Sequence, residues 1–195
     1  MSSSSPLERW LAAVVATPGL TSLDDLADAR RVLLEDSLAG AGLVARFAGA
    51  IVDVGSGGGA PGIPLAHAFP DREVVLLEAE RRKCVFLETV APPNARVVWG
   101  RAEEQETDWA GVAVAKALAR PPTAAEWCLP LVREGGAVVL WLGPTADLDR
   151  VAAVAERVAG KLEDAPSGFA VIRKTGPTPA GFPRRAGVAK KRPLA

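Results

Sequence analysis

The stretch IVDVGSGGGAPGIPLA, residues 51 to 66, decides the fold of this chain. An apolar run typical of a buried strand leads into a turn rich in glycine and proline, and a helix-like segment follows. Gly55, Gly57 and Ala60 satisfy the pattern G-x-G-x-x-G/A. Glycine tolerates positive φ and lets a ligand approach the backbone without a Cβ in the way. We therefore expect a strand, a ligand-binding turn and a helix, the alternative being a tight turn that binds nothing.

The strand pattern of this stretch recurs downstream. Short apolar runs occupy residues 50–54, 73–78, 95–99, 111–115, 137–142 and 169–174. They are continuous rather than alternating, which indicates strands covered on both faces, as in a mostly parallel sheet. Helix-like segments at 80–90, 123–132 and 147–160 separate them. The order predicts an α/β fold with a doubly wound, mostly parallel sheet of the Rossmann-like kind.

The remaining segments suggest three parts. Residues 1–45 are helical in pattern and too short to bury a core alone, so we expect a short helical cap on the sheet. Residues 46–176 form the main ligand-binding domain. Residues 177–195 form a basic C-terminal segment that completes it.

Composition excludes several classes of protein. Two cysteines, Cys84 and Cys128, and a single histidine, His67, are too few for a disulfide framework or a zinc cluster, so we expect no metal. All three are interpreted as packing residues. The N-terminus lacks the pattern of a signal peptide and no apolar run reaches membrane-spanning length. We expect a cytoplasmic protein without a membrane partner, with a monomer favoured and the oligomeric state open.

Charge is unevenly distributed along a chain that is neutral overall. From residue 173 onward there are seven Lys or Arg and no Asp or Glu. Removing those seven from the total leaves 16 basic residues against 23 acidic ones, a net charge of minus seven. A basic ribbon on an acidic body is expected of a segment that meets polyphosphate, although a merely solvated tail would have the same composition.

Two acidic residues narrow the choice of ligand. Asp53 lies two residues before the first glycine, where it would repel the pyrophosphate of a dinucleotide and attract a cationic ligand such as S-adenosylmethionine. Glu78 ends the second expected strand, 23 residues after Gly55, where an acid hydrogen-bonds ribose hydroxyls in both kinds of site. Glu78 supports a nucleoside, and the choice of cofactor depends on Asp53. An NAD-type oxidoreductase remains the less favoured alternative.

Several motifs together resemble one family. The residues IVDVGSGGGAPGIPLA, LLEAERRKCVFLETV, VVWGRAEE, AVAKALARP, CLPLVREGG and VIRK…FPRRAGVAKKRPL occur in the order typical of the RsmG (GidB) family. The resemblance implies a class I S-adenosylmethionine-dependent methyltransferase that modifies N7 of a guanine in 16S rRNA of the small ribosomal subunit. It also implies that Gly55, Ala60, Ala102 and Glu103 line the cofactor site.

The chain departs from the family pattern at two positions. Lys116 stands where the family has an arginine that contacts the site, and Arg120 lies one helical turn further on. Leu33 stands where the family commonly has a histidine. These departures motivate a second alternative, a catalytically impaired rRNA-binding homologue that retains the cofactor pocket.

The expected chemistry needs few groups. Guanine N7 carries no proton, so no general base is required, and catalysis can come from positioning and from excluding water. No catalytic residue is assigned, with Lys116 the candidate. RNA would be bound by the cations of the basic ending, and Phe182 either stacks on a base or packs on the sheet. The predicted RNA-binding residues are Arg184, Arg185, Lys190, Lys191 and Arg192.

Overall fold

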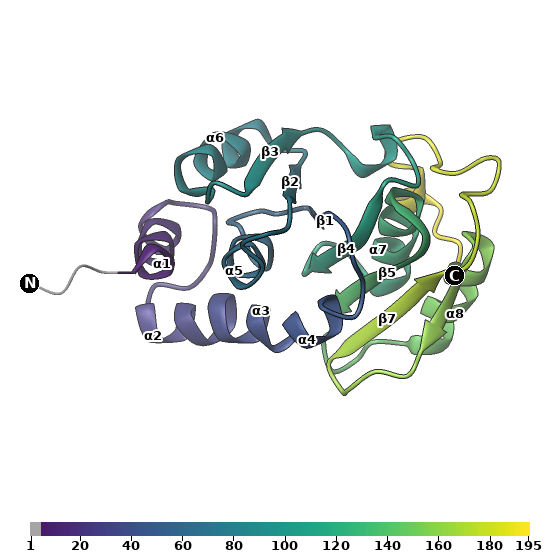
Figure 1. The fold of residues 1–195 in the computed structure, drawn as a ribbon, viewed down its shortest axis with the longest axis horizontal. Coiled ribbons are helices and arrows are strands. Elements are labelled where there is room, and N and C mark those ends of the chain that lie inside the picture. The colour runs from purple at the N-terminus through teal and green to yellow at the C-terminus, as the bar shows by residue number, and fades with distance from the viewer. Residues whose placement is uncertain (1–4) are drawn as a thin grey trace, which may run out of the picture.

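The computed structural model describes residues 5–195 and contains one sheet of seven strands. Its strand order is β3-β2-β1-β4-β5-β7-β6 (Figure 1). Strands β1 to β5 pair in parallel, and β7 runs antiparallel to both of its neighbours. The expected doubly wound, mostly parallel sheet is confirmed.

The cap consists of helical segments that precede the first strand. α1 (Pro6–Ala16) begins with a capping box in which Ser5 and Glu8 bond each other's backbone. After a turn, the chain continues through short segments without leaving a helical path. These are α2 (Leu26–Ala29), the π-helical η1 (Arg30–Glu35), α3 (Asp36–Ala39) and α4 (Ala41–Val44).

The parallel half of the sheet alternates strands and helices as its sequence pattern indicates. Its elements are β1 (Ile51–Val54), α5 (Gly62–Ala68), β2 (Val74–Glu78), α6 (Arg81–Val90), β3 (Ala95–Trp99), the 3-10 turn η2 (Ala102–Glu104), β4 (Ala110–Lys116), α7 (Pro121–Cys128), the 3-10 turn η3 (Leu129–Leu131) and β5 (Val132–Trp141). β1 lies at the centre, with Asp53 opposite Leu76 of β2 and Val114 of β4.

The C-terminal half closes the sheet with a hairpin. It contains α8 (Leu148–Arg157), β6 (Gly160–Glu163), β7 (Phe169–Lys174) and a last short helix, α9 (Val188–Lys191). Residues 175–195, called the C-terminal segment below, follow β7 and run beside α7 and α8 (Figure 1, yellow).

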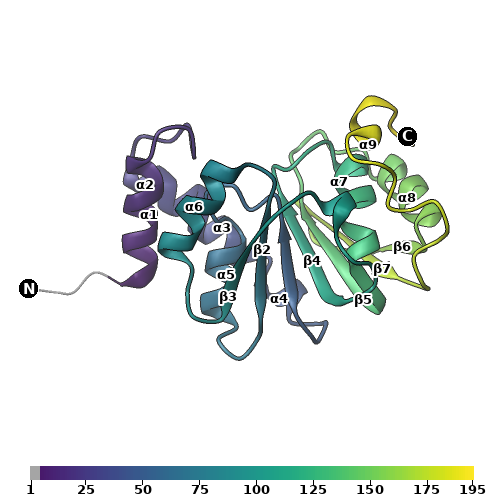
Figure 2. The same ribbon diagram turned by 90° about the horizontal axis from the view of Figure 1, so that it is seen from above.

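Helices cover both faces of the sheet (Figure 2). One face packs on α1, α5 and α6 through a core that includes Trp10, Ile51 and Leu87. The other face packs on α7 and α8 through Val52, Cys128 and Val154. Both strand faces of β1 and β2 are buried, as continuous apolar runs require. Within the described residues no helix is long and apolar enough to cross a membrane.

Several boundaries differ from the sequence prediction. The helix expected at 147–160 ends at Arg157, and Gly160 already belongs to β6. The segment expected to be helical to residue 132 ends its α-helix at Cys128, and β5 already begins at Val132. β6 was not expected, because GKLE is short and largely polar. It lies at the edge of the sheet, where only one neighbour, β7, is needed to pair it.

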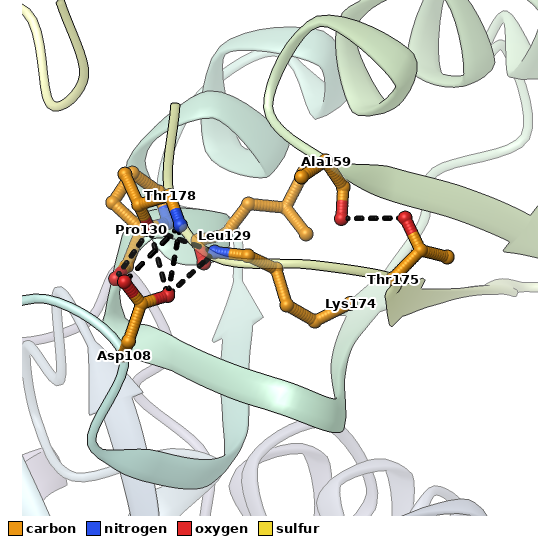
Figure 3. Close-up of polar contacts among 7 residues, drawn as sticks. All are labelled: Asp108, Leu129, Pro130, Ala159, Lys174, Thr175 and Thr178. Carbon is orange, nitrogen blue, oxygen red and sulfur yellow. Dashed lines mark hydrogen bonds and ion pairs between the residues drawn. The ribbon is translucent and has the colours of Figure 1, made fainter. Parts of the chain in front are cut away.

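The C-terminal segment begins at a buried ion pair (Figure 3). The Lys174 side chain is fully buried, and its Nζ donates to Asp108 Oδ1 at 3.0 Å, Leu129 O at 2.9 Å and Thr178 Oγ1 at 2.7 Å. The Asp108 carboxylate also accepts the backbone N–H of Thr178. Burial alone would raise the pKa of Asp108, but the bonds from Lys174 and Thr178 leave it below its usual value. This cluster fixes the direction in which the segment leaves β7.

Candidate functional site

The glycine turn after β1 packs against Leu118 at Gly55 but has no close neighbour at Gly57. Gly55 has φ +73°, a conformation that favours glycine, and a Cβ there would displace Leu118, whose Cδ1 would lie 2.3 Å away. Gly57 has φ +54°, but a Cβ there would meet nothing nearer than the Gly55 carbonyl oxygen at 3.8 Å. The turn therefore presents bare backbone at Gly57 to open space.

That open space is a cavity of about 560 Å³, in the size range of small-molecule sites. It lies at the carboxyl ends of the parallel strands, where doubly wound sheets bind their ligands. The structure brings seven of the eight predicted cofactor residues to its wall: Gly55, Gly57, Ala60, Glu78, Ala102, Glu103 and Lys116.

Glu78, at the end of β2, is buried and fixed by backbone donors. Its Oε2 accepts the N–H of Gly57 at 2.9 Å, and its Oε1 accepts the N–H of Glu80 at 2.8 Å. The carboxylate thus braces the glycine turn and also lines the cavity. Each oxygen keeps a further lone pair that a ligand hydroxyl could use.

Asp53 is the predicted residue that does not line the cavity. It is buried behind the glycine turn, with its Oδ2 accepting the N–H of Gly62 at 3.0 Å. Gly62 permits this approach, since a Cβ there would lie 2.6 Å from that oxygen. Burial raises the pKa of Asp53 to about 7, against the lowering effect of the Gly62 bond. The side chain supports the start of α5, and its contact with a cofactor stays a prediction.

Lys116, at the end of β4, reaches the cap. Its Nζ donates to the Val32 carbonyl and forms an ion pair with Asp36 Oδ2 at 2.9 Å. The Lys116 side chain is only 12% exposed. This ammonium therefore joins the sheet to the cap across the cavity. Arg120 lines a separate cavity, so it does not take the place of Lys116.

Glu103 links the cavity to the C-terminal segment. It lies in η2, and its side chain is 5% exposed. Its Oε1 accepts the backbone N–H of Gly187 at 3.0 Å, and Gly187 has φ +80°. This predicted cofactor residue thus also holds a turn of the C-terminal segment.

Several cavity residues were not predicted from the sequence. Leu20, Val32 and Asp36 come from the cap, Lys83 from α6, and Leu118 and Trp127 from the region after β4. Leu33, which was singled out only as a departure from the family pattern, also lines the cavity. Trp127 Nε1 is buried without a hydrogen-bond partner among residues 5–195, which leaves an unused donor in the wall.

The cations of the basic ending fall into two groups. Arg184 donates from Nε and Nη2 to the two carboxylate oxygens of Glu126, at 2.5 and 2.6 Å, and Glu126 is almost fully buried. Arg173 pairs with Glu163, and Lys174 with Asp108. Three of the seven basic residues are therefore occupied by carboxylates of the body. The exposed residues are Arg185, Lys190, Lys191 and Arg192.

Three further side chains, Phe182, Cys84 and Cys128, are packed in ways that the sequence analysis considered. Phe182 lies against the core cluster of α7 and α8, which is the packing alternative weighed for it. Cys84 and Cys128 are buried, and burial raises the pKa of both thiols, so neither is suited to nucleophilic attack.

Comparison with known proteins agrees with this geometry. The family model GidB, described as rRNA small subunit methyltransferase G, matches residues 7–165. A protein of Synechococcus elongatus named ribosomal RNA small subunit methyltransferase G is 34% identical over 90% of this chain and 82% of its own. One of Symbiobacterium thermophilum with the same name is 38% identical over 74% of this chain and 69% of its own.

Solved structures show the same fold at low sequence identity. A SAM-dependent O-methyltransferase of Thermotoga maritima aligns with a TM-score of 0.58 and 14% identity, covering 82% of this chain and 72% of that one. A 16S rRNA N2 methyltransferase of T. thermophilus, solved with AdoMet and guanosine, aligns with a TM-score of 0.52 and 15% identity over 68% of this chain and 37% of that one. The fold is the Rossmann-like methyltransferase fold, and the chain belongs to the GidB family of small-subunit rRNA methyltransferases.

Proposed function

We propose that this protein transfers a methyl group from S-adenosylmethionine to N7 of a guanine in the 16S rRNA of the small ribosomal subunit. The observation that carries the proposal is the cavity at the glycine turn, whose wall combines the predicted cofactor residues with residues of the cap. Membership of the GidB family supports rRNA as the substrate. We also propose that the protein is cytoplasmic and monomeric, and that the chain divides into three parts with boundaries after residues 45 and 176.

The glycine turn favours a cationic cofactor over a dinucleotide. In a dinucleotide site, free N–H groups of the turn and of the following helix bind the pyrophosphate. Here the N–H of Gly57 donates to Glu78 and that of Gly62 donates to Asp53. A pyrophosphate would find both N–H groups already bonded and would meet the Glu78 carboxylate in the cavity wall. A ligand with an ammonium and a sulfonium suits that environment.

The same residues fit an adenosyl cofactor in shape. The bare backbone at Gly57 leaves room for a ligand that a Cβ would fill. Glu78 would bind the ribose hydroxyls, and Ala102 with Glu103 would lie at the adenine. Lys116 is bonded to Val32 and Asp36 of the cap. It can contact the cofactor as predicted only if it keeps both bonds while facing the ligand.

For methyl transfer to N7, the protein mainly has to position the guanine relative to the cofactor. When bound, S-adenosylmethionine supplies an electrophilic methyl group on a sulfonium. The chain holds the guanine in line with that methyl and keeps water out, and no side chain needs to remove a proton. The buried thiols, which the mechanism does not use, agree with this assignment.

The four exposed cations of the C-terminal segment are proposed to bind phosphates. They are Arg185, Lys190, Lys191 and Arg192. The RNA role predicted for Arg184 stays a prediction, and its bond to Glu126 makes structural support the better-founded role. Removing the whole segment would be a poor test of RNA binding. It would leave Glu126 buried without its cation and take Gly187 from Glu103, which lines the cofactor cavity.

Mapping the modified nucleotide tests the proposal in the cell. Small-subunit rRNA from cells with and without the gene is digested and compared by mass spectrometry. We expect one guanine to carry a methyl group on N7 only when the gene is present. Identical fragment masses in the two strains would reject the proposed activity.

A further inference from the structure

The carboxylate of Asp36 lies in the cavity wall with only one of its two oxygens bonded within residues 5–195. Asp36 is the first residue of α3, and its side chain is 49% exposed. Lys116 pairs with Oδ2 at 2.9 Å, while no described residue bonds Oδ1. Its backbone carbonyl accepts Trp141 Nε1 at 2.8 Å, which ties this point of the cap to β5. The carboxylate is therefore held in place from the sheet, with one oxygen left free.

Besides Asp36 and its partner Lys116, the cap and the end of β4 contribute apolar side chains to the cavity wall. Val32 and Leu33 come from η1, and Leu118 comes from the end of β4. Such side chains can cover the faces of a planar base, while a single polar group reads its edge. Enzymes that modify a base commonly bind the extruded base in this way, through its Watson–Crick edge.

We propose that Asp36 binds the Watson–Crick edge of the target guanine and so determines the choice of base. This inference rests on the proposed function and names the residue that selects its substrate. Guanine presents two adjacent donors on that edge, the N1–H and the N2 amino group, which can bond the free Oδ1 and the remaining lone pair of the Lys116-paired Oδ2. The charge of the Asp36 carboxylate is balanced by Lys116, which acts as its positioning residue.

The arrangement excludes the other bases. Adenine at N1 and cytosine at N3 offer acceptors in the middle of that edge, and uracil flanks its single N–H with two carbonyl oxygens, all of which a carboxylate repels. Guanine N7 lies on the opposite, Hoogsteen side of the base, where it is an acceptor. A guanine held at N1 and N2 by Asp36 therefore keeps N7 free to face the methyl group.

Inosine tests the inference, because it lacks only the N2 amino group and keeps N7. Small subunits are assembled with rRNA in which the mapped guanosine, or inosine in its place, has been ligated from a synthetic fragment. The kcat/KM for methyl transfer is measured for both substrates with the wild-type protein and with Asp36→Asn. Glu35→Gln, an exposed residue beside Asp36 that does not line the cavity, is the matched control.

For the wild-type protein and for Glu35→Gln, we expect inosine to lower kcat/KM by about tenfold or more, as for a lost hydrogen bond to a charged group. Asp36→Asn should be slower on guanosine but lose less than about threefold on changing to inosine, since the bond is already weakened. The far-UV circular dichroism spectrum of Asp36→Asn should match that of the wild-type protein and so show an intact fold.

Two results would overturn the inference. Equal rates of the wild-type protein on both substrates would show that the N2 amino group is not read. A full inosine penalty in Asp36→Asn would assign the reading to another residue. Failure of the wild-type protein to methylate the guanosine substrate is a different outcome, which would reject the proposed function itself.

Discussion

The glycine turn, residues 55–62, and the C-terminal segment are both held by carboxylates of the body, but through different partners. In the turn, Glu78 and Asp53 accept backbone N–H groups and meet no cation. In the C-terminal segment, Asp108 and Glu126 pair with Lys174 and Arg184. The first arrangement leaves the Glu78 carboxylate in the cavity wall without an ion-pair partner among residues 5–195. The second arrangement pairs each carboxylate with a cation, so only the cations of the basic ending that lack a carboxylate partner remain available to bind RNA.

The largest expected effect is the difference in stability between a variant that removes a paired cation and one that removes its exposed neighbour. Arg184→Ala leaves Glu126 buried without a partner, and we expect the free energy of unfolding to fall by about 3 to 5 kcal/mol. Arg185→Ala, one residue further and exposed, should change it by less than about 0.5 kcal/mol. Urea denaturation followed by circular dichroism measures both. Equal stabilities of the two variants would contradict the division of the cations.

A second prediction concerns the pH dependence that Asp53 contributes. Its pKa is about 7 in the native protein, against an ordinary value of 3.8. Between these values the native state holds a proton that the unfolded chain has lost, so the contribution of Asp53 to stability falls as pH rises and is constant above 7. Asp53→Asn lacks this titration. The stability of the variant relative to the wild-type protein should therefore rise by roughly 3 kcal/mol from pH 4 to pH 7.

Urea midpoints of both proteins across that pH range give the measurement. Any other titrating group contributes equally to the two proteins, so only their difference is informative. If the stabilities of the two proteins differ by the same amount at every pH, Asp53 is ionised throughout this range and acts as a fixed anion behind the turn.

A third prediction separates strain from ligand contact at the glycine turn. Gly57→Ala places a Cβ on the cavity side and should weaken binding of S-adenosylhomocysteine by tenfold or more. Gly168→Ala is the control, because Gly168 also has positive φ, +88°, with nothing within 4 Å of a Cβ, and lies outside the cavity. Both should lose about 1 kcal/mol of stability from the strained backbone. If calorimetry gives both variants wild-type affinity, the turn does not contact the cofactor.

The smallest effects are expected at the exposed cations. Lys190→Ala, Lys191→Ala and Arg192→Ala should each weaken binding to purified small-subunit rRNA and lower the slope of log affinity against log salt by roughly 0.7 to 1. Arg96→Ala, exposed on the edge strand β3, is the control. Fluorescence anisotropy over a series of salt concentrations measures the slope. A slope that stays the same in the triple variant would remove these residues from the RNA-binding surface.

Much of the fold could be predicted because the buried strands are continuous apolar runs interrupted by helices. β6 could not, because an edge strand needs one neighbour and little apolar surface. The cofactor end of the cavity was predictable from spacing, since its residues follow consecutive strands. Asp36 was not, because Lys116 and Trp141 bring it to the cavity from a distant part of the chain.

The C-terminal segment shows the same limit. Arg184 and Arg185 are adjacent and identical in type, so no sequence pattern separates them. What separates them is Glu126, which α7 places within reach of one guanidinium only. Charge composition could predict that the segment is basic, but not which of its cations are already neutralised.

Transfer of a labelled methyl group tests the central claim most directly. The purified protein is incubated with trideuteromethyl S-adenosylmethionine and small ribosomal subunits from cells that lack the gene, and the rRNA nucleosides are analysed by mass spectrometry. We predict deuterated 7-methylguanosine at a single site. Absence of label in the rRNA, or label on any atom other than guanine N7, would contradict the account.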